Sequence, residues 1–346
     1  MTRRETAVLM ALVTTLVIVF LLSLALGSTS VPLGRVVTAL LHGASERDPL
    51  AMVVSSIRLP RSVTAMLAGA ALGIAGLQMQ TLFRNPLADP FALGISSGAS
   101  LGVALVVLGC GYGPASAFGT AMGMRGDALI TVAAIVGAAL VLGLVLVVSS
   151  HIANPATVLI LGLMFGYAVS AIVTVLVGAS QPERLQQWAQ WGFGSFSGVT
   201  WQRLKLFGPL VLSGMLIAST TTKQLNALLL GENYARSMGL AVRRARFLTM
   251  LGASILGAMV TAFCGPISFL GIAVPHLCRG LLGSSDHRVL VPAVVLMGAA
   301  VALVAQIVSL LPGSGVVLPL NAVTSLMGAP VVVAVLLRSR RGAFVG

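Results

Sequence analysis

Charged residues are scarce in this chain of 346 residues: Asp, Glu, Lys and Arg account for only 8% of it, whereas apolar residues account for 57%. A water-soluble domain carries about a quarter charged residues. The shortage excludes an ordinary soluble globular protein. The lipid bilayer is therefore the expected surrounding of most of the chain.

Cysteine is also rare. Cys110, Cys264 and Cys278 stand singly in apolar stretches, and neither their spacing nor their odd number fits a metal-ligand cluster or a set of disulfides. We expect them to behave as small apolar residues, and we expect no metal site and no cofactor in the chain.

The sequence lacks a phosphate-binding loop of the form G-x-x-x-x-G-K-[ST], and its only lysines are Lys205 and Lys223. Without that loop the chain cannot be a P-loop ATPase. We expect no enzymatic activity, so if ATP drives its function, ATP and Mg²⁺ bind to a separate partner subunit. The net charge of +13 does not indicate nucleic acid, because the basic residues fall mostly between apolar runs, where they set membrane topology.

Acidic residues are absent from the middle of the apolar runs. All eight lie in predicted loops or at the ends of predicted spans: Glu5, Glu46, Asp48, Asp89, Asp127, Glu183, Glu232 and Asp286. An ion-coupled carrier usually keeps an ionisable group near the membrane midplane. This argues against an ion-coupled secondary transporter of a small solute, which stays open as the alternative function because backbone carbonyls also bind sodium.

Apolar runs of about 20 residues, long enough to cross a bilayer as helices, occur ten times. They are Val8–Leu26, Ser62–Phe83, Phe91–Cys110, Ala128–Val148, Ala156–Ala179, Leu204–Thr222, Phe247–Cys264, Ile267–Leu282, Val289–Leu311 and Leu318–Leu337. Asp89-Pro90 and Asn154-Pro155 each place a capping side chain before a proline suited to the first helical turn. We expect an all-α membrane protein with about ten transmembrane helices in a single domain, 1–346. The 39 glycines predict close helix packing.

The Lys and Arg residues set the expected orientation. If the N-terminus lies inside, the inner segments hold thirteen of them and the outer segments eight. Cytoplasmic loops carry the excess of basic residues. We expect a multi-pass protein of the cytoplasmic (inner) membrane with both termini in the cytoplasm.

Two connecting segments stand out. All three tryptophans, Trp188, Trp191 and Trp201, fall within 181–203, which predicts a short interfacial helix on the periplasmic side. The segment 225–246 is the largest predicted cytoplasmic connection and contains a short amphipathic helix that stops at Gly239, since glycine suits the left-handed residue past a helix end. It is either a docking helix for a soluble partner or a solvated loop with topology-setting arginines.

Three further patterns have structural explanations. Gly94-x-Ser96-x-Gly98 matches a serine-nucleophile pattern, but it opens an apolar helix, where small residues favour packing; an intramembrane enzyme using Ser96 is the competing hypothesis. His276 is expected to hydrogen-bond its neighbours rather than to bind haem. A short similarity between 91–95 and 269–272, on opposite predicted faces, is typical of inverted repeats.

Seven short motifs in a specific order resemble the FecCD-type permease family, the membrane subunits of type II ABC importers for ferric siderophores, haem and vitamin B12. They are Arg-Leu-Pro-Arg at 58–61, Gly-Ala-Ala-Leu at 69–72, Asn-Pro-Leu-Ala-Asp-Pro at 85–90, Gly-Glu with Ala and Met-Gly at 231–239, Gly-Pro-Ile at 265–267 with Pro275, His276 and Arg279, Asp-His-Arg at 286–288 and Gly-Ala-Pro at 328–330. The resemblance covers nearly the whole chain.

This resemblance implies a fold like that of the vitamin B12 importer permease. It also implies a homodimer with the pathway along its axis, two ABC ATPase subunits below it and a periplasmic or lipid-anchored substrate-binding protein above it. The implied activity is import of an iron-siderophore, haem or cobalamin-like ligand by alternating access.

The resemblance also implies roles for particular residues. Arg58 and Arg61 would dock the binding protein, and Asn85 and Leu87 would form part of the cytoplasmic gate. ATPase coupling would fall to Gly231, Glu232, Tyr234, Ala235, Arg236, Ser237, Met238, Gly239 and Leu240. The ligand itself is not readable, because a pathway lined by small apolar residues carries no specificity code.

Overall fold

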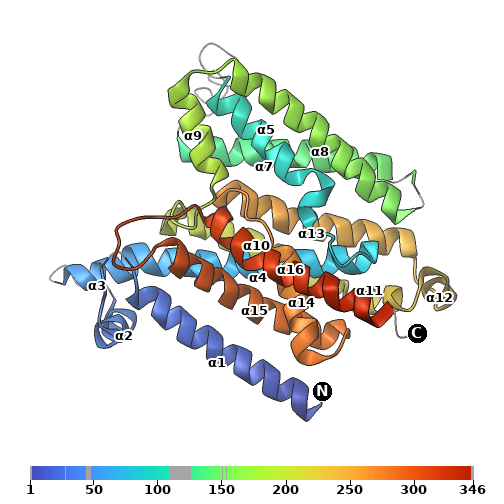
Figure 1. Cartoon of the computed structure of the whole chain (residues 1–346), viewed down its shortest axis with the longest axis horizontal. Coiled ribbons are helices and arrows are strands. Elements are labelled where there is room, and N and C mark those ends of the chain that lie inside the picture. Colours follow the sequence, from blue (N-terminus) through green and yellow to red (C-terminus); the bar gives the residue numbers. More distant parts are fainter. Residues whose placement is uncertain are drawn as a thin grey trace.

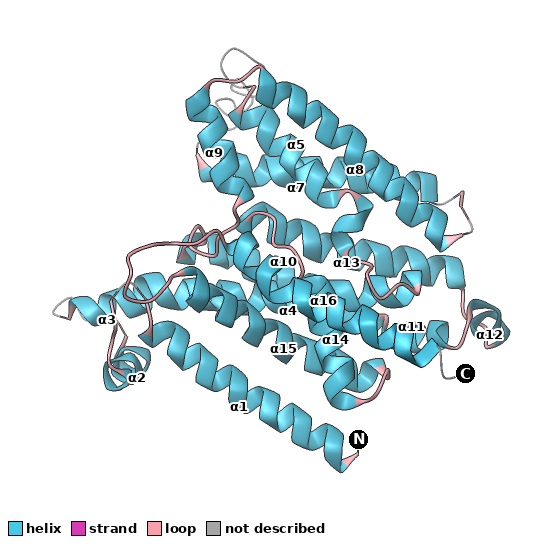
Figure 2. Cartoon of the chain, in the orientation of Figure 1, coloured by secondary structure: helices cyan, strands magenta, loops and turns pink. Residues whose placement is uncertain are grey.

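The computed structural model describes residues 2–27, 29–43, 48–109, 126–149, 151–152 and 154–343, and within these ranges the chain forms helices and no strand (Figure 2). In chain order the elements are α1 (Arg3–Ala25), α2 (Leu33–His42), α3 (Pro49–Val53), the π-helical turn η1 (Val54–Arg58), α4 (Leu59–Phe83), the 3-10 turn η2 (Pro90–Leu93), α5 (Ile95–Val107), α7 (Asp127–Ser149), α8 (Pro155–Gly178), α9 (Pro182–Gly192), α10 (Trp201–Thr220), α11 (Thr222–Leu229), α12 (Glu232–Ser237), α13 (Val242–Cys264), α14 (Leu270–Leu282), α15 (His287–Ser309) and α16 (Leu320–Ala343).

Each of the ten predicted spans coincides with one of these helices, which confirms the fold class. Among the described residues, six helices are long and apolar enough to cross a bilayer: α1, the continuous stretch from α3 to α4, α7, α8, α13 and α15. The pair α10 and α11, bent by 46°, adds a seventh. The expected span lengths are wrong for α5 and α14, which have 13 residues each.

The two short helices share an irregular beginning. Gly94, before α5, has φ 77°, and Phe269, before α14, has φ 69°, so both residues are left-handed. A helix of 13 residues is about 20 Å long and does not cross about 30 Å of hydrocarbon. The segments that lead to the two helices start from opposite ends of the bundle, since one follows α4 and the other follows the antiparallel α13. This arrangement agrees with the expected inverted repeat.

Asp89 occupies an unexpected position between these elements. A Cβ added to Gly271 would lie 3.3 Å from Asp89 Oδ2 and 3.4 Å from the carbonyl oxygen of Leu72, which is near the middle of α4. Asp89 therefore lies at the level of the middle of α4. The expectation that acidic side chains stay in loops or near the span ends is wrong for this residue. Its Oδ1 accepts a hydrogen bond of 2.9 Å from the Phe91 amide, so it caps η2.

Helix α4 forms the centre of the molecule, and nearly every residue from Ala65 to Phe83 is half-buried or buried. It packs on α10, α13, α14 and α15. A Cβ added to Gly69 would lie 2.1 Å from the carbonyl oxygen of Gly298, and one added to Gly76 would lie 1.8 Å from that of Gly271. Only glycine allows such contacts, which confirms the predicted close packing.

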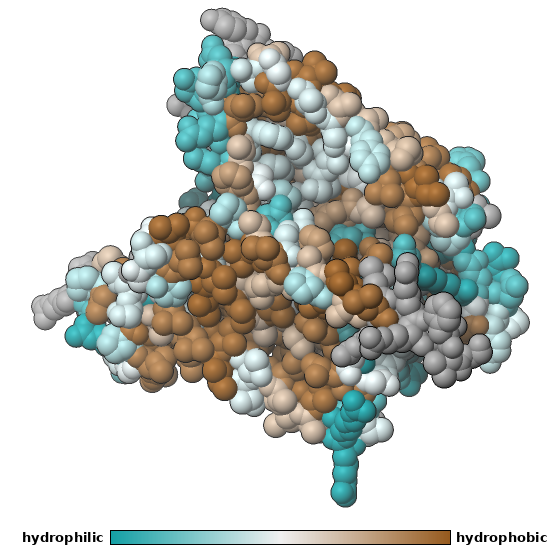
Figure 3. All heavy atoms as spheres, in the orientation of Figure 1, coloured by the Kyte–Doolittle hydropathy of each residue, from teal (hydrophilic) through white to brown (hydrophobic). Residues whose placement is uncertain are grey.

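The remaining helices form two groups around this centre (Figure 1). Helices α5, α7, α8 and α9 lie together, α1, α14, α15 and α16 lie on the other side of α4, and α13 packs between α4 and the pair α5 and α7. The start of α1 lies on the same side of the molecule as α12 (Figure 1). Hydrophobic atoms cover much of the surface, and hydrophilic atoms gather near α9 and near α12 and the start of α1 (Figure 3).

The small and sulfur-containing residues singled out in the sequence serve packing. Cys264 and Cys278 are buried thiols, whereas Cys110 lies outside the described residues. Gly98, in the pattern around Ser96, faces α7, where an added Cβ would lie 2.5 Å from the carbonyl oxygen of Gly137. The pattern therefore sits at a tight helix interface, as expected of a packing motif.

Candidate coupling and gating site

Helix α12 is entered through a glycine in an unusual conformation. Gly231, which precedes it, has φ 115° and ψ 148°, a backbone region that only glycine occupies readily. This turn directs the chain from the end of α11 into α12. The carbonyl oxygen of Gly231 then accepts a hydrogen bond of 2.8 Å from the Ala235 amide, which opens the helix.

The end of α12 confirms the predicted stop at Gly239, which has φ 83°. Its amide donates to the carbonyl oxygen of Arg236 at 2.9 Å, and the Leu240 amide donates to that of Ala235 at 3.0 Å. This pair of bonds is a Schellman motif, which satisfies carbonyl groups at the helix end. No heavy atom outside the chain neighbours lies within 4 Å of a Cβ added to Gly239, so the demand for glycine is conformational.

One face of α12 is fixed to the bundle. Ala235 is fully buried, and Glu232 forms an ion pair with Arg246 in the second turn of α13. A longer contact of 3.9 Å joins Glu232 to Arg236, whose side chain is 63% exposed. The Glu232–Arg246 pair holds the first turn of α12 against α13.

The opposite face of α12 is open. Tyr234 is 53% exposed and Met238 is 54% exposed. The hydroxyl of Ser237 donates a hydrogen bond of 2.8 Å to the carbonyl oxygen of Tyr234 within the same helix. Leu240 packs against the core and ends the segment. A short helix with an anchored face and an exposed aromatic and thioether face is suited to insertion into a partner groove.

The loop after α4 contains the two predicted gate residues. Asn85 Oδ1 accepts a hydrogen bond of 2.9 Å from the Leu87 amide, which shapes a tight turn and leaves Leu87 37% exposed. His276 Nε2 donates to the carbonyl oxygen of Pro86 at 2.7 Å. His276 therefore ties this loop to α14, which confirms its expected structural role.

Arg84 joins the gate loop to the coupling segment. It ends α4 in a left-handed conformation with φ 47°, and its guanidinium donates to the carbonyl oxygen of Leu228, at the end of α11, at 3.1 Å. In the sequence Arg84 contributes only to the positive charge of an inner loop. The sequence gives no local sign of this contact, because 144 residues separate Arg84 from Leu228.

A second polar connection runs from α11 through α15 to α4. Asn226 Nδ2 donates to Asp286 Oδ1 at 2.7 Å, and the ring of buried His287 lies between Asn226 and Thr81. The Arg288 amide donates a hydrogen bond to Asp286, and the side chain of Asn226 donates a second. The first bond has the larger effect, and both hold the pKa of the Asp286 carboxyl group below the usual value. The carboxylate thus stays charged at the N-terminus of α15, where a negative charge is stabilised by the helix dipole.

Helix α14 is fixed to α4 by a buried amide. Gln80 Oε1 accepts a hydrogen bond of 2.5 Å from Arg279, and Gln80 Nε2 donates to the carbonyl oxygen of Ile272 at 3.2 Å. Together with the bond from His276 to the gate loop, these contacts join α4, α14 and the gate loop at several points.

The two arginines expected to dock a binding protein differ in exposure. Arg58 is only 7% exposed, and its guanidinium donates to the carbonyl oxygens of Leu24, Ala25 and Thr29 at 2.5–2.9 Å. These bonds close the C-terminal end of α1, so the guanidinium of Arg58 is not available for docking a partner protein. Arg61 is half-buried at the same end of α4 and remains the candidate for an outer contact.

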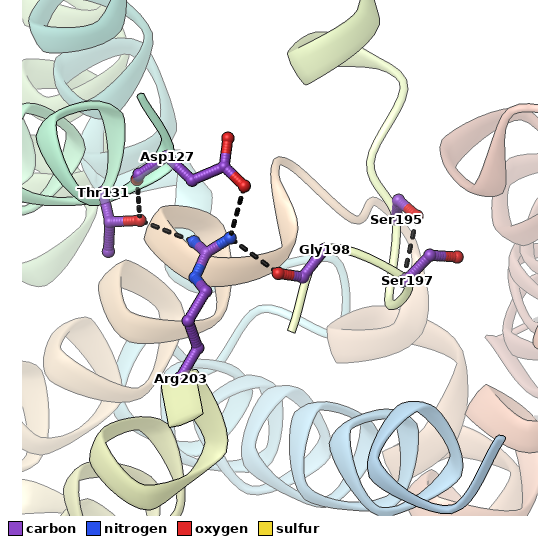
Figure 4. A network of polar contacts seen from close by, with 6 residues as sticks. All are labelled: Asp127, Thr131, Ser195, Ser197, Gly198 and Arg203. Carbon is purple, nitrogen blue, oxygen red and sulfur yellow. Dashed lines mark hydrogen bonds and ion pairs between the residues drawn. The ribbon is translucent and has the colours of Figure 1, made fainter. Parts of the chain in front are cut away.

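Arg203, in the first turn of α10, bonds to several elements (Figure 4). It donates to the carbonyl oxygen of Gly198 at 2.6 Å and to Thr131 Oγ1 at 2.6 Å, and it lies 3.4 Å from Asp127 Oδ2. It also lies over the ring of Phe263, 5.7 Å from the centroid. These contacts connect α10 with α7, α13 and the segment before α10.

The tryptophan-rich segment contains the expected short helix, α9. Trp188 and Trp191 are half-buried and pack against the core, whereas Trp201 is 42% exposed and donates from Nε1 to the carbonyl oxygen of Ser55 at 2.8 Å. In the part of the chain that the structure describes, no three His, Cys, Asp or Glu side chains group as metal ligands would.

Comparison with known proteins places this geometry in context. The model of the FecCD transport family matches residues 15–338. The vitamin B12 import system permease protein BtuC of Klebsiella pneumoniae is 37% identical over 339 residues, covering 98% of this chain and 96% of the relative. The BtuC protein of Citrobacter koseri is 36% identical over 291 residues, covering 84% of each chain.

A solved structure has the same fold. It is an inward-facing conformation of a protein assigned to the metal-chelate type of ABC transporter, with a TM-score of 0.82 and 28% sequence identity. The match covers 96% of this chain and 99% of the solved one.

Proposed function

The chain belongs to the FecCD transport family, and on that premise we propose that it moves an iron-siderophore, haem or cobalamin-like ligand from a substrate-binding protein into the cytoplasm. It is a membrane-spanning permease subunit of an ABC importer, and its ATPase is a separate subunit. The observation that carries the proposal is the bond from Arg84 to Leu228, because it joins the coupling segment to the gate loop.

The assembly that we propose is a homodimer with two ABC ATPase subunits and a periplasmic or lipid-anchored binding protein. Three cavities among the described residues have volumes of about 300, 180 and 370 Å³, at or below the lower end of the range for sites that enclose small molecules. A bulky chelate needs more room than these cavities offer. A pathway between two copies of the chain provides it.

We propose that both termini and α12 lie in the cytoplasm. The excess of Lys and Arg on that side, thirteen against eight, supports this orientation. Arg203 and Arg61 then lie on the periplasmic side, and Arg61 is available to an acidic residue of the binding protein. Such complementary charge chiefly speeds encounter and fixes register.

The mechanism that we propose uses α12 as the moving contact. ATP binding closes the partner ATPases, and the exposed face of α12 with Tyr234 and Met238 follows them. Arg84 transmits this displacement to the turn at Asn85 and Leu87, while Asn226 transmits it to α15 through His287. The gate then alternates between two arrangements, as an alternating-access device requires.

Transport in proteoliposomes tests this function. The chain is reconstituted with its ATPase and binding protein, and uptake of labelled cobalamin, haem and ferric siderophores is measured with and without ATP. We expect ATP-dependent uptake of at least one of these ligands, and none from liposomes that lack the ATPase. Uptake driven by an ion gradient without the ATPase would instead support the secondary-transporter alternative, for which Asp89 is the ionisable candidate.

A further inference from the structure

A cavity of about 300 Å³ opens at the ends of four transmembrane helices, beside α12. It is bounded by the C-terminal ends of α4 and α7 and by the N-terminal ends of α8 and α13. Its polar lining residues are Ser149, His151, Arg236, Arg243 and Arg246, and the rest of its described lining is apolar. Because four helix ends meet there, the cavity lies at the level of the lipid headgroups.

The lining separates into an arginine rim and an apolar floor. Arg236 and Arg243 are exposed at the rim, and the side chain of Arg246, which also lines the cavity, is 17% exposed. The floor is apolar and buried, since four of its residues are only 5–6% exposed: Leu82, Val158, Val242 and Met250. No Asp or Glu occurs among the described lining residues.

Positive charge dominates the rim. Glu232 forms ion pairs with both Arg246 and Arg236, and the described lining contributes three guanidinium groups and no carboxylate to the cavity itself. Guanidinium groups bind phosphate in a bidentate manner and are the usual choice for phosphate recognition. The chemistry of the rim therefore favours a phosphate group.

The apolar floor distinguishes a lipid phosphate from a free one. A free phosphate or a nucleotide would leave the floor uncovered, whereas the acyl chain of a phospholipid covers it. Exposed apolar side chains occur on the same two helices close to the lining residues in sequence: Val147 of α7 is 63% exposed and Ile160 of α8 is 58% exposed. Basic pockets between transmembrane helices at the cytoplasmic side bind anionic lipid headgroups.

We propose that this cavity is a binding site for one anionic phospholipid of the inner leaflet, with the headgroup phosphate on Arg236, Arg243 and Arg246 and an acyl chain on the apolar floor. The assignment to the inner leaflet rests on the proposed orientation with α12 in the cytoplasm, and it does not depend on which ligand is transported. The bound lipid would adjoin the Glu232–Arg246 pair that holds α12.

Two neighbouring arginines provide a matched experiment. Arg243 lines the cavity, whereas Arg244, which is also exposed and occupies the next position of α13, lines a different depression with Gln224 and Leu240. Native mass spectrometry of the purified full chain measures retention of phosphatidylglycerol against phosphatidylcholine. We expect the wild type and Arg244→Gln to retain phosphatidylglycerol preferentially, and Arg243→Gln to lose about fivefold in that preference.

Two controls make the result decisive. Circular dichroism and thermal melting identify variants that fail to fold, and Arg243→Lys, which keeps the charge, is expected to restore part of the preference. Addition of inorganic phosphate or ATP is expected not to displace the lipid. Equal loss in Arg243→Gln and Arg244→Gln would overturn the site, and displacement by inorganic phosphate would show a simple anion site instead.

Discussion

The Nδ1 atom of His287 lies 2.7 Å from Oδ1 of Asn226, so one imidazole joins the start of α15 to α11. The same amide oxygen accepts a 2.9 Å bond from the His287 backbone N–H, which fixes the orientation of the Asn226 amide. Nδ1 must therefore carry the proton. The hydroxyl of Thr81 on α4 lies 2.9 Å from Nε2 and 2.9 Å from the carbonyl oxygen of Leu77, so its one proton is shared between these two acceptors.

Asn226→Ala is expected to weaken this connection. It leaves the buried imidazole N–H of His287 without its acceptor, which costs about 1–3 kcal/mol of folding free energy. If the connection also transmits motion, ligand uptake per ATP hydrolysed falls in proteoliposomes. Gln186→Ala on the exposed surface of α9 is the control. Unchanged thermal stability together with unchanged uptake per ATP would contradict the assigned role.

Gly239→Val is expected to uncouple transport. A β-branched residue at φ 83° costs roughly 1–3 kcal/mol, and no steric clash adds to it. The spans are expected to survive, so the complex assembles and binds its loaded partner, but ATP hydrolysis no longer drives uptake. Gly239→Asn, which tolerates the left-handed region better, is expected to retain more activity. If Gly239→Val supports normal uptake per ATP, the segment is only a solvated loop.

Arg58 and Arg61 are expected to respond differently to reversal of charge. Arg58→Glu removes several bonds from a buried guanidinium, each worth about 1.5–3 kcal/mol, and thus lowers stability and expression. Arg61→Glu is expected to leave expression intact and to weaken association with the binding protein, most strongly at low salt. Equal association of wild type and Arg61→Glu at low salt would exclude Arg61 from the docking surface.

Leu87→Cys tests the gate and the dimer together. The proposed pathway runs along the dimer axis, and the thiols of Cys264 and Cys278 are buried. A thiol at position 87 is expected to cross-link two copies of the chain under mild oxidation, to an extent that changes when ATP is added. An exposed cysteine away from the axis, Leu41→Cys on α2, is the control. Equal cross-linking at both positions would count against the gate.

The purified chain is expected to hydrolyse no ATP by itself. Its sequence has no phosphate-binding loop, and in the family the ATPase is a separate subunit. Phosphate release is measured before and after addition of the ATPase subunit. Hydrolysis by the chain alone, free of contaminating ATPase, would disprove the assigned division of labour.

Apolar runs and caps predicted much of the fold. All ten runs became helices, and Asn154 caps α8 as expected, accepting a bond of 2.9 Å from the Ala156 amide. Asp89 caps a 3-10 turn instead of the expected α-helix. Hydropathy records that a segment is apolar, but it does not record the depth at which the helix begins, which is why α5 and α14 are shorter than expected.

The candidate site was predictable where its signal is local. The glycine at 239 and the polar face of α12 are readable from ten consecutive residues. The expected docking role of Arg58 assumed an exposed side chain, because a basic residue at a span end is usually on the surface. Only folding brings the end of α1 next to Arg58 and buries it. The contacts of Arg84 and Asn226 join residues 144 and 60–61 positions apart, and no local pattern encodes them.

The shortness of α5 and α14 also constrains how the chain enters the bilayer during synthesis. A 13-residue helix preceded by irregular backbone exposes unpaired peptide groups to hydrocarbon if it inserts alone. Each short helix must therefore enter together with the long helix before it, α4 or α13, as a hairpin shielded by protein. The long helix of each pair is apolar enough to span the bilayer by itself, so it is the short helix that depends on its partner during insertion.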